Sequence, residues 1–255
     1  MPAQDIKIAL LGDVHANLPA LEAVLSHASS LGVTAYWNIG DFVGYNAFPE
    51  QVVKRMRKRK FSNIIGNYDL KVLNFPQKDK KWRRDKQPLK WLAFKWAYQN
   101  LSPESRAYLA VLPEERSLEI GKQNFLLVHG SPASNEDLLG QDTPIARLLE
   151  LKQIAENKYE AEFAAIICGH SHQAFTRRAG STLFVNTGSV GRPGDGNPRA
   201  AYAILQVSQA KLRVSHYRLN YDIGKAVSAN RKKGLPEAFT KMIVEGRDLE
   251  WILEN

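Results

Sequence analysis

A series of short apolar runs, each followed by a turn-forming group of residues, constrains the fold of this chain more than any other feature. The runs span residues 6–11, 35–39, 64–65, 125–128, 164–168 and 183–185. Most of them end at Gly-Asp, Gly-Asn, His-Gly or Gly-His, and the last ends at Asn-Thr-Gly. Continuous apolar runs of this kind are typical of strands that are buried on both faces. We therefore expect a sheet that is covered by helices.

The segments between the runs indicate those helices. Residues 18–31 place apolar side chains on one face at helical spacing. Further helices are expected at residues 49–60, at 142–157, at 236–245 and, in one or two pieces, at 89–112. Residues 70–122 contain no obvious strand before their end. We expect this segment to be a helical insertion that could cap a site.

The last part of the chain has a different pattern. Residues 202–207 and 212–217 read as two antiparallel strands, joined by a turn at 208–211. Alternating strands and helices followed by a β-rich part favour a layered α/β sandwich over a purely doubly wound sheet. We expect one domain over residues 1–255.

The composition excludes several classes of protein. The chain has 255 residues, of which 44% are hydrophobic, so it can bury a core and is not of the disordered class. No stretch approaches the roughly 20 apolar residues of a membrane span. Residues 1–5 lead straight into an apolar run without the features of a signal peptide. The one cysteine, Cys168, excludes an internal disulfide. Together these features predict a cytoplasmic protein with no membrane partner.

The positive charge of the chain is concentrated in two segments. The net charge is +9, while residues 54–60 carry six positive charges and residues 78–90 carry a net +5. Such segments can attract nucleic acid, a membrane surface or small anions. The aromatic residues near 78–90 could stack bases, although Trp91, Phe94 and Tyr98 fall at the helical spacing of a core face. Both interpretations stay open, as does a solvated helix face for residues 54–60.

Polar side chains follow the predicted strands at the point where each strand ends. They are Asp13, His15, Asp41, Asn67, Asp69, His129, His170 and His172. In α/β sheets, ligands bind in the crevice at the carboxyl ends of the strands, so we expect these side chains to gather there. The set includes four of the six histidines in the chain.

Seven of these residues, all except Asp69, are donors of the kind that bind Mn, Fe, Ni, Co or Zn. Seven donors are too many for one metal in an open catalytic site, but they suit two metals that share a carboxylate. Each short motif is a weak signal by itself, because Gly-Asp after a strand is often only a turn. The complete set, in this order, predicts a centre of two divalent transition-metal ions, with manganese the first candidate.

The motifs resemble those of a known family. Asp13-Val14-His15, Gly40-Asp41, Gly66-Asn67-Tyr68-Asp69, His129-Gly130 and Gly169-His170-Ser171-His172 occur in the order found in calcineurin-like metallophosphoesterases. The segments 186–191 and 234–236 look like the bacterial and archaeal predicted phosphoesterase branch. The resemblance implies a four-layer αββα sandwich. It also implies one metal held by Asp13, His15, Asp41 and His172, and another held by Asp41, Asn67, His129 and His170.

The family's chemistry implies a phosphoesterase that uses a metal-bridging hydroxide, with Asp41, Asn67, Tyr68 and Asp69 as catalytic residues. Many members of the family have histidine where this chain has Tyr68. A phenol with a pKa near 10 is a poor proton donor at pH 7, so we expect phosphodiesters with good leaving groups, or dinucleoside polyphosphates, to be preferred over alkyl monoesters. The alternative for Tyr68 is that it only packs beside Asn67.

The predicted substrate-binding residues lie outside the metal motifs. Arg192 and Arg199 belong to the glycine-rich loop 189–199, and arginine can bind phosphate through two hydrogen bonds. Tyr45 follows the Asp41 turn and could line the pocket. The basic segments leave a nuclease or other nucleic-acid-processing enzyme open as a rival function. A non-catalytic scaffold is less favoured, because the ligand set is complete.

Overall fold

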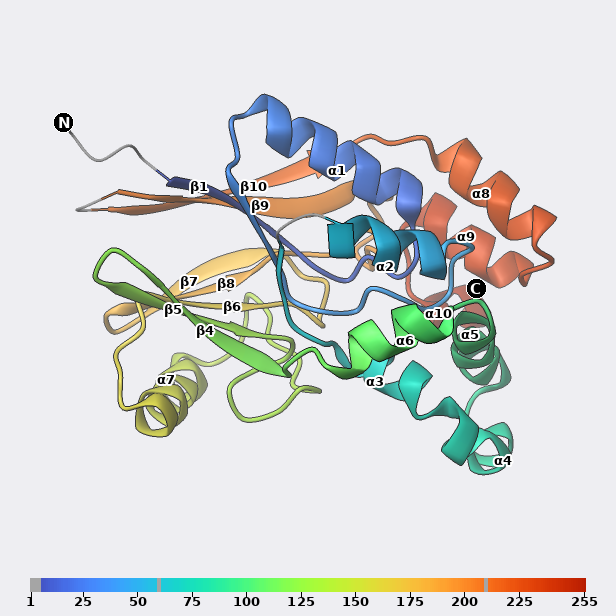
Figure 1. Cartoon of the computed structure of the whole chain (residues 1–255), viewed down its shortest axis with the longest axis horizontal. Helices are drawn as coiled ribbons and strands as arrows, with labels where there is room; N and C mark the ends of the chain where they lie inside the picture. The colour runs from blue at the N-terminus through green and yellow to red at the C-terminus, as the bar shows by residue number, and fades with distance from the viewer. Residues whose placement is uncertain (1–5, 59–60, 209–210) are drawn as a thin grey trace.

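Two five-stranded sheets face each other in the computed structural model, which describes residues 6–58, 61–208 and 211–255 (Figure 1). The first sheet contains, in spatial order, β10 (Leu212–Leu219), β9 (Ala200–Val207), β1 (Ile6–Leu11), β2 (Ala35–Asn38) and β3 (Phe61–Asn63). The second contains β4 (Glu115–Ile120), β5 (Gln123–Val128), β6 (Ala165–Cys168), β8 (Thr182–Asn186) and β7 (Phe175–Ala179).

Parallel strands form one run in each sheet. Strands β1, β2 and β3 are mutually parallel, and so are β5, β6 and β8, whereas β4, β7, β9 and β10 pair antiparallel to their neighbours. The carboxyl ends of the parallel strands therefore lie together within each sheet, and residues from the strand ends of both sheets come together in the structure. The loops that leave them meet there, beside the helices that follow β3 (Figure 1).

Alternation along the strands divides the hydrophobic core. In β1, Ile8 and Leu10 pack between the two sheets, while Ala9 and Leu11 face the helices. In β5, Leu127 faces the first sheet and Leu126 faces a helix on the opposite side. Successive side chains of a strand point to opposite faces, so each central strand must be apolar on both. This explains the continuous apolar runs in the sequence.

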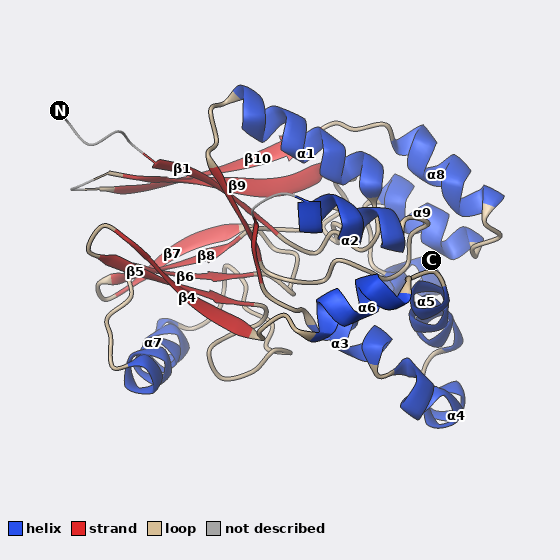
Figure 2. Cartoon of the chain, in the orientation of Figure 1, coloured by secondary structure: helices blue, strands red, loops and turns tan. Residues whose placement is uncertain are grey.

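The described residues form ten helices (Figure 2). They are α1 (Leu18–Ser30), α2 (Pro49–Lys58), α3 (Asn67–Leu73), α4 (Phe75–Asp85), α5 (Pro88–Gln99), α6 (Pro103–Ala110), α7 (Ile145–Tyr159), α8 (Ile223–Lys232), α9 (Glu237–Glu245) and α10 (Leu249–Glu254). Helix α1 covers the first sheet and α7 covers the second (Figure 1). The predicted four-layer α/β sandwich is confirmed. None of the helices in the described part of the chain is long and apolar enough to cross a membrane.

Several predicted boundaries were wrong. Strand β3 ends at Asn63, so residues 64–65 lie just beyond it, where the Ile64 amide donates to the Asn38 carbonyl oxygen (3.1 Å). Strand β4 lies inside the segment predicted as an insertion, so the sheet resumes at Glu115. Strand β7 and helices α8 and α10 were not predicted, and α3 and α4 were covered only by the general expectation of a helical segment at 70–122. In α4 only Phe75 is buried, which leaves almost no apolar stripe to recognise. Predictions on residues 1–5, 59–60 and 209–210 fall outside the described residues.

The aromatic residues of the helical segment serve packing. Trp91 and Trp96 pack against the helix-covered core, and their indole nitrogens donate to Asp79 Oδ1 (2.8 Å) and the Asn46 carbonyl oxygen (3.3 Å). Tyr98 lies in the same cluster. Rings held in this way are not free to stack on bases, which favours the core-face interpretation.

Candidate metal centre

The strand-end loops are tied to one another through their backbones. The Asp13 amide donates to the Gly40 carbonyl oxygen and the His15 amide to that of Asp41, both at 3.0 Å. In the second sheet, the Gly169 amide donates to the His129 carbonyl oxygen (2.8 Å). These bonds hold the loops after β1, β2, β5 and β6 in fixed positions. The side chains on the loops therefore meet at one edge of the sandwich.

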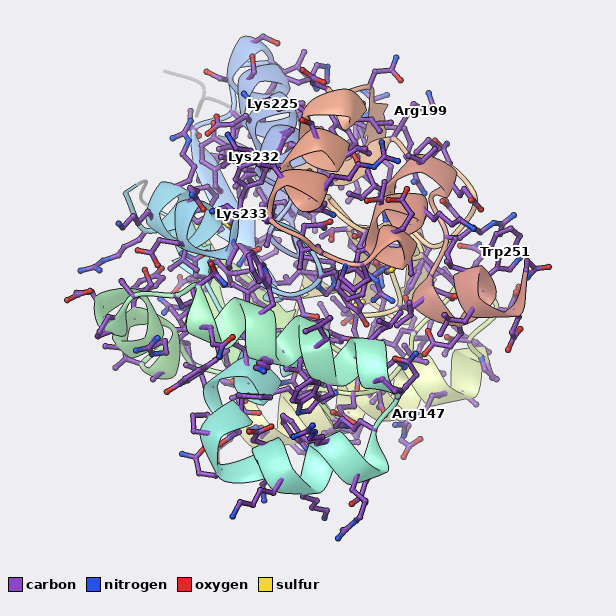
Figure 3. The ribbon with its side chains drawn as sticks, turned by 90° about the vertical axis from the view of Figure 1, so that its right-hand side faces the viewer. Arg147, Arg199, Lys225, Lys232, Lys233 and Trp251 are labelled. Atoms are coloured by element: carbon purple, nitrogen blue, oxygen red, sulfur yellow. The ribbon has the colours of Figure 1, made fainter. Side chains whose placement is uncertain are left out.

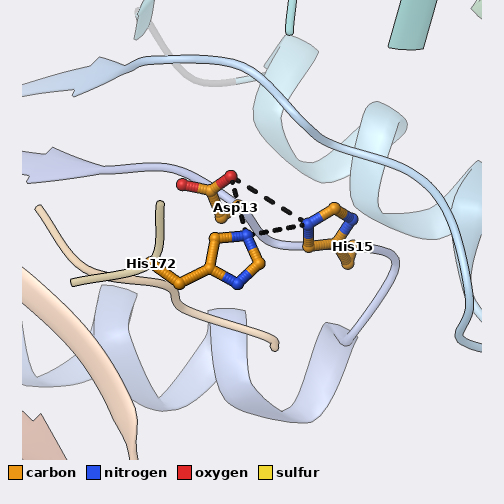
Figure 4. A group of neighbouring side chains, drawn as sticks. All are labelled: Asp13, His15 and His172. Carbon is orange, nitrogen blue, oxygen red and sulfur yellow. Dashed lines mark hydrogen bonds and ion pairs between the residues drawn. The ribbon is translucent and has the colours of Figure 1, made fainter. Parts of the chain in front are cut away.

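One group of donors comprises Asp13, His15 and His172 (Figure 4). The His172 Nε2 atom lies 3.2 Å from Asp13 Oδ1 and 3.3 Å from His15 Nε2. Asp13 and His15 are completely buried. Two sheets contribute to this group, since His172 follows β6 and the other two residues follow β1.

A second group comprises Asp41, His129 and His170. Asp41 Oδ2 lies 3.5 Å from His129 Nε2, and the Asn67 side-chain oxygen lies 3.3 Å from the same nitrogen. Asp41 Oδ2 also lies 3.6 Å from His15 Nε2, which belongs to the first group. The Asp41 carboxylate therefore stands between the two groups.

Backbone amides fix the outer oxygen of each carboxylate. Asp41 Oδ1 accepts a hydrogen bond from the Tyr68 amide (2.8 Å), and Asp13 Oδ2 accepts one from the His170 amide (3.1 Å). The inner oxygens, Asp41 Oδ2 and Asp13 Oδ1, face imidazole nitrogens instead. Asp13 Oδ1 has no hydrogen-bond partner among the described residues. Each carboxylate thus keeps one oxygen available for a further ligand.

Two imidazoles are oriented in the same manner. His129 Nδ1 lies 2.7 Å from the Ile39 carbonyl oxygen, and His15 Nδ1 lies 3.2 Å from that of Val43. A carbonyl oxygen can only accept, so each Nδ1 carries a proton, and Nε2 is the nitrogen that faces the centre and would bind a metal ion. This is the arrangement that histidine ligands of metals adopt.

The donor spacing fits metal ions. Two ligands of one ion at about 2.1 Å lie about 3.0–3.4 Å apart in octahedral or tetrahedral geometry. The 3.2 Å and 3.3 Å separations around His172 Nε2 agree with that spacing. Lone pairs that face one another without an intervening proton repel, so a cation between them would remove an unfavourable contact. The residues present therefore suit two divalent ions, and the roles of individual residues as ligands remain a prediction.

The backbone of the centre is strained. Five of the seven predicted ligands have left-handed backbone: Asp13 (φ 52°), His15 (φ 45°), Asp41 (φ 53°), His170 (φ 62°) and His172 (φ 60°). Such a conformation costs a non-glycine residue about 1–3 kcal/mol and persists where the surroundings enforce it. Strain gathered at these positions indicates that the fold is arranged around the function of this loop cluster.

Glycine allows the loops to approach the carboxylates. A Cβ atom at Gly66 would lie 2.1 Å from Asp41 Oδ1, and one at Gly169 would lie 2.6 Å from Asp13 Oδ2. Any side chain at these positions would displace a carboxylate. The glycines that ended the apolar runs are therefore required by the site as well as by the turns.

The two inward-facing imidazoles titrate in opposite directions. Burial lowers the pKa of His15 to about 3. Burial also opposes the charged form of His129, but the Asp41 carboxylate outweighs it and raises the pKa of His129 to about 9. In the absence of cations, a proton on His129 partly neutralises the centre.

Asp69 lies behind the centre. Its two oxygens accept from the backbone amides of Gly66 (3.1 Å) and Val43 (3.2 Å), and the residue is completely buried. Burial and the Asp41 charge raise the pKa of Asp69 to about 8. Asp69, a predicted catalytic residue, therefore links the loops after β2 and β3. This is the geometry of a residue that positions the loops of the centre.

Tyr68 and Tyr45 form a tilted aromatic pair beside the first donor group, with ring centres 5.3 Å apart. The Tyr68 hydroxyl is hydrogen-bonded to the Tyr45 hydroxyl, and the Tyr68 ring meets the His15 ring edge to face at 5.1 Å. Burial and the neighbouring Tyr45 raise the pKa of Tyr68 well above its usual value, so the phenol is neutral at pH 7. The Arg192 guanidinium lies 4.3 Å over the Tyr45 ring.

A cleft of about 880 Å³ opens onto the centre. Its walls include Asn67, Tyr68, His170, His172 and Arg192. Tyr45 lies beneath Arg192 and does not line this cleft. Arg199 does not line the cleft and lies at the surface (Figure 3). Its Nε atom donates to Asn197 Oδ1 (3.1 Å). Of the three predicted substrate residues, only Arg192 reaches the cleft.

Sequence reasoning missed three lysines that line the cleft, Lys71, Lys86 and Lys90. Two of them belong to the basic segment 78–90, which was noted for its charge but not assigned to a site. The remaining lysines of that segment do not line the cleft.

Comparisons with known proteins agree with this geometry. A sequence model of the calcineurin-like phosphoesterase superfamily domain matches residues 6–210. An uncharacterized protein of Methanocaldococcus jannaschii is 28% identical over 257 residues, covering 94% of this chain and 98% of that protein. A metallophosphoesterase from Sphaerobacter thermophilus has a similar structure, with a TM-score of 0.74 and 27% identity over 95% of this chain and 100% of that one.

A hypothetical protein from Pyrococcus horikoshii shares the fold, with a TM-score of 0.84 and 21% identity over 94% of this chain and 98% of that one. These three proteins come from bacteria and archaea, as the resemblance implied. The superfamily uses a dinuclear divalent metal site, and the structure contains two Asp/His groups in the matching region. The chain belongs to the calcineurin-like phosphoesterase superfamily.

Proposed function

We propose that this chain is a dinuclear metal-dependent phosphodiesterase or dinucleoside polyphosphate hydrolase, with manganese as its native metal. One observation carries the proposal. Two groups of inward-facing donors flank Asp41 Oδ2 beside a cleft of about 880 Å³, which is large enough for a nucleotide. We also keep the cytoplasm as the predicted compartment.

The proposed ligands are the seven predicted residues. Asp13, His15 and His172 would hold one ion, His129, His170 and Asn67 the other, and Asp41 would contact both. When bound, two such cations supply Lewis acidity and an activated water for attack on phosphorus. The chain contributes fixed donors, because the backbone bonds of the strand-end loops set their positions before substrate arrives.

Arg192 would bind the substrate. Its Nε atom is buried and has no hydrogen-bond partner among the described residues, while the guanidinium rests on the Tyr45 ring and lines the cleft. A phosphoryl oxygen is the acceptor such a group prefers. The loop holds it in place, since Ser189 Oγ accepts from the Arg192 amide (2.8 Å).

Tyr68 would act as a positioning residue and would not protonate the leaving group. Its raised pKa makes it a weak acid, and its hydroxyl is already paired with Tyr45. Leaving groups that are stable as anions need no proton, which supports aryl diesters and phosphoanhydrides as substrates over alkyl monoesters.

The test is a manganese-supplemented hydrolysis panel. It compares bis-p-nitrophenyl phosphate, diadenosine tetraphosphate, a cyclic nucleotide and an alkyl monoester, with Asp41→Asn as the control. We expect the aryl diester or the polyphosphate to have the highest kcat/KM, and Asp41→Asn to be inactive. Fastest turnover of the alkyl monoester would contradict the assignment of substrate class, and an active Asp41→Asn would refute the site.

The nuclease alternative has less support. Residues 54–57, the part of the 54–60 basic run whose side chains the structure describes, do not line the cleft. Arg55 is instead paired with Glu22 (2.5 Å). Salt-sensitive cleavage of DNA or RNA that outpaces the small substrates would favour it.

A further inference from the structure

One wall of the cleft carries three lysines from three different elements. Lys71 belongs to α3, Lys86 lies between α4 and α5, and Lys90 belongs to α5, and all three line the cleft that holds the metal centre. The Lys71 Nζ atom lies 5.6 Å from the centre of the Tyr68 ring, which places it next to the metal centre. We call these residues the lysine wall.

Two of the three ammonium groups have partners that can be exchanged. Lys71 pairs with Glu136 (2.7 Å), and Lys90 pairs with Glu250. The side chains of Glu136 and Glu250 are 63% and 53% exposed. Ion pairs this exposed contribute little to the stability of a protein, so an incoming anion can replace the glutamates at little cost.

Lys86 has no such partner. No carboxylate in the described part of the chain lies within ion-pair distance of it, and its Nζ atom lies 5.2 Å from the centre of the Trp82 ring. Burial lowers the pKa of Lys86, the ammonium groups of Lys71 and Lys90 lower it further, and Glu136 acts in the opposite direction. Lys86 is a partly buried cation close to two others, so a compact group of negative charges would reduce the repulsion among the three ammonium groups.

Carboxylates also line the cleft. Glu136 and Glu250 pair with the lysine wall, whereas Asp142, Asp195 and Asp248 do not. An extended nucleic-acid backbone would have to pass them and would be repelled. Carboxylates accept hydrogen bonds from hydroxyl and amino groups, so a nucleoside can face these residues while its phosphates face the lysines.

We propose that Lys71, Lys86 and Lys90 bind the additional phosphates of a polyphosphate chain, beyond the phosphate held at the metal centre. The substrate would then be a nucleotide with phosphoanhydride links, such as a dinucleoside polyphosphate. A simple diester has no additional phosphates for the lysines to bind. This inference rests on the proposed function for the identity of the reaction, but the anion site itself does not depend on catalysis.

The direct test is calorimetric titration of the full-length protein with inorganic tripolyphosphate in EDTA, where neither metal complexes nor hydrolysis contribute. Lys86→Met should weaken binding about tenfold, because one charge-assisted contact is lost. Lys80→Met removes the same charge from the exposed side of α4 and should change the Kd less than twofold. Lys90→Met is a second variant with the same expectation as Lys86→Met, and melting curves verify that each is folded.

Equal affinity of Lys86→Met, Lys90→Met and wild type for tripolyphosphate would overturn the inference. A ten-nucleotide DNA that displaces tripolyphosphate at equal or lower concentration would also overturn it, in favour of nucleic acid. In the kinetic arm, Lys86→Met should lower the ratio of kcat/KM for diadenosine tetraphosphate to that for bis-p-nitrophenyl phosphate about tenfold. Lysine-dependent binding without any hydrolysis would refute the proposed function while leaving the anion site supported.

Discussion

The metal centre and the lysine wall line the same cleft, but they are built in different ways. The centre uses buried side chains on left-handed backbone, fixed by amides of neighbouring loops. The lysine wall uses long, half-buried side chains from α3, α5 and the turn between α4 and α5, and two of the three lysines pair with exposed glutamates. Chemistry that needs donors placed to within a fraction of an ångström is located on rigid strand ends, whereas selection by charge tolerates flexible side chains.

The largest difference in kinetic effect should be seen between one substitution in the metal centre and one in the lysine wall. Asp41→Asn should lower kcat/KM about 1,000-fold or more on every substrate, because the carboxylate shared by both donor groups is lost. Lys86→Met should change only the ranking of substrates. Steady-state kinetics on the two test substrates measure both effects. A uniform loss in Lys86→Met, equal on both substrates, would remove the distinction between the regions.

The rigidity of the centre can be tested at Gly66. Gly66→Ala places a Cβ atom 2.1 Å from Asp41 Oδ1 and 2.3 Å from the Asp41 amide, so it should lower the free energy of unfolding by about 3 kcal/mol. Urea denaturation measures this loss. Gly121→Ala is the control: its φ is +62° but nothing lies within 4 Å, and it should cost only about 1 kcal/mol. Equal losses at the two glycines would mean that the loop tolerates displacement.

Tyr68 tests whether an aromatic neighbour of the centre takes part in proton transfer. Tyr68→Phe keeps the ring against His15 and removes only the hydroxyl. We expect kcat for bis-p-nitrophenyl phosphate to fall less than about fivefold, because a true general acid would contribute about 100-fold or more. A loss of 100-fold, together with a shifted alkaline limb of the pH–rate profile, would make Tyr68 a catalytic residue.

The smallest expected effect concerns the glutamate partners of the lysine wall. Glu250→Gln frees Lys90 from its ion pair and should tighten tripolyphosphate binding about twofold. Glu254→Gln, on the same helix and exposed, should leave the Kd unchanged. Weaker binding in Glu250→Gln would indicate that the glutamate helps to place Lys90 instead of competing with the anion.

The metal centre could be predicted from the sequence more fully than the lysine wall, for a physical reason. Residues that follow parallel strands must converge at the strand ends, so Asp13, Asp41 and His129 could be placed together without coordinates. Their pairing into two groups came only from the resemblance, and the positioning geometry of Asp69 was not foreseen.

The lysine wall could not be predicted in that way. Its members come from α3, α5 and the turn before α5, and their convergence depends on how these helices pack. Helix α4 has only one buried residue, so periodicity gave no sign of it or of the turn that carries Lys86. Arg199 shows the opposite error, because a plausible phosphate-binding residue in a glycine-rich loop lies at the surface.

Manganese titration of the purified chain tests the central claim, which is a two-ion centre bridged by Asp41. Equilibrium dialysis followed by elemental analysis should find two manganese ions per wild-type chain and no more than one per Asp41→Asn chain. Two ions retained with unchanged affinity in Asp41→Asn, or none bound by the wild type, would contradict the account.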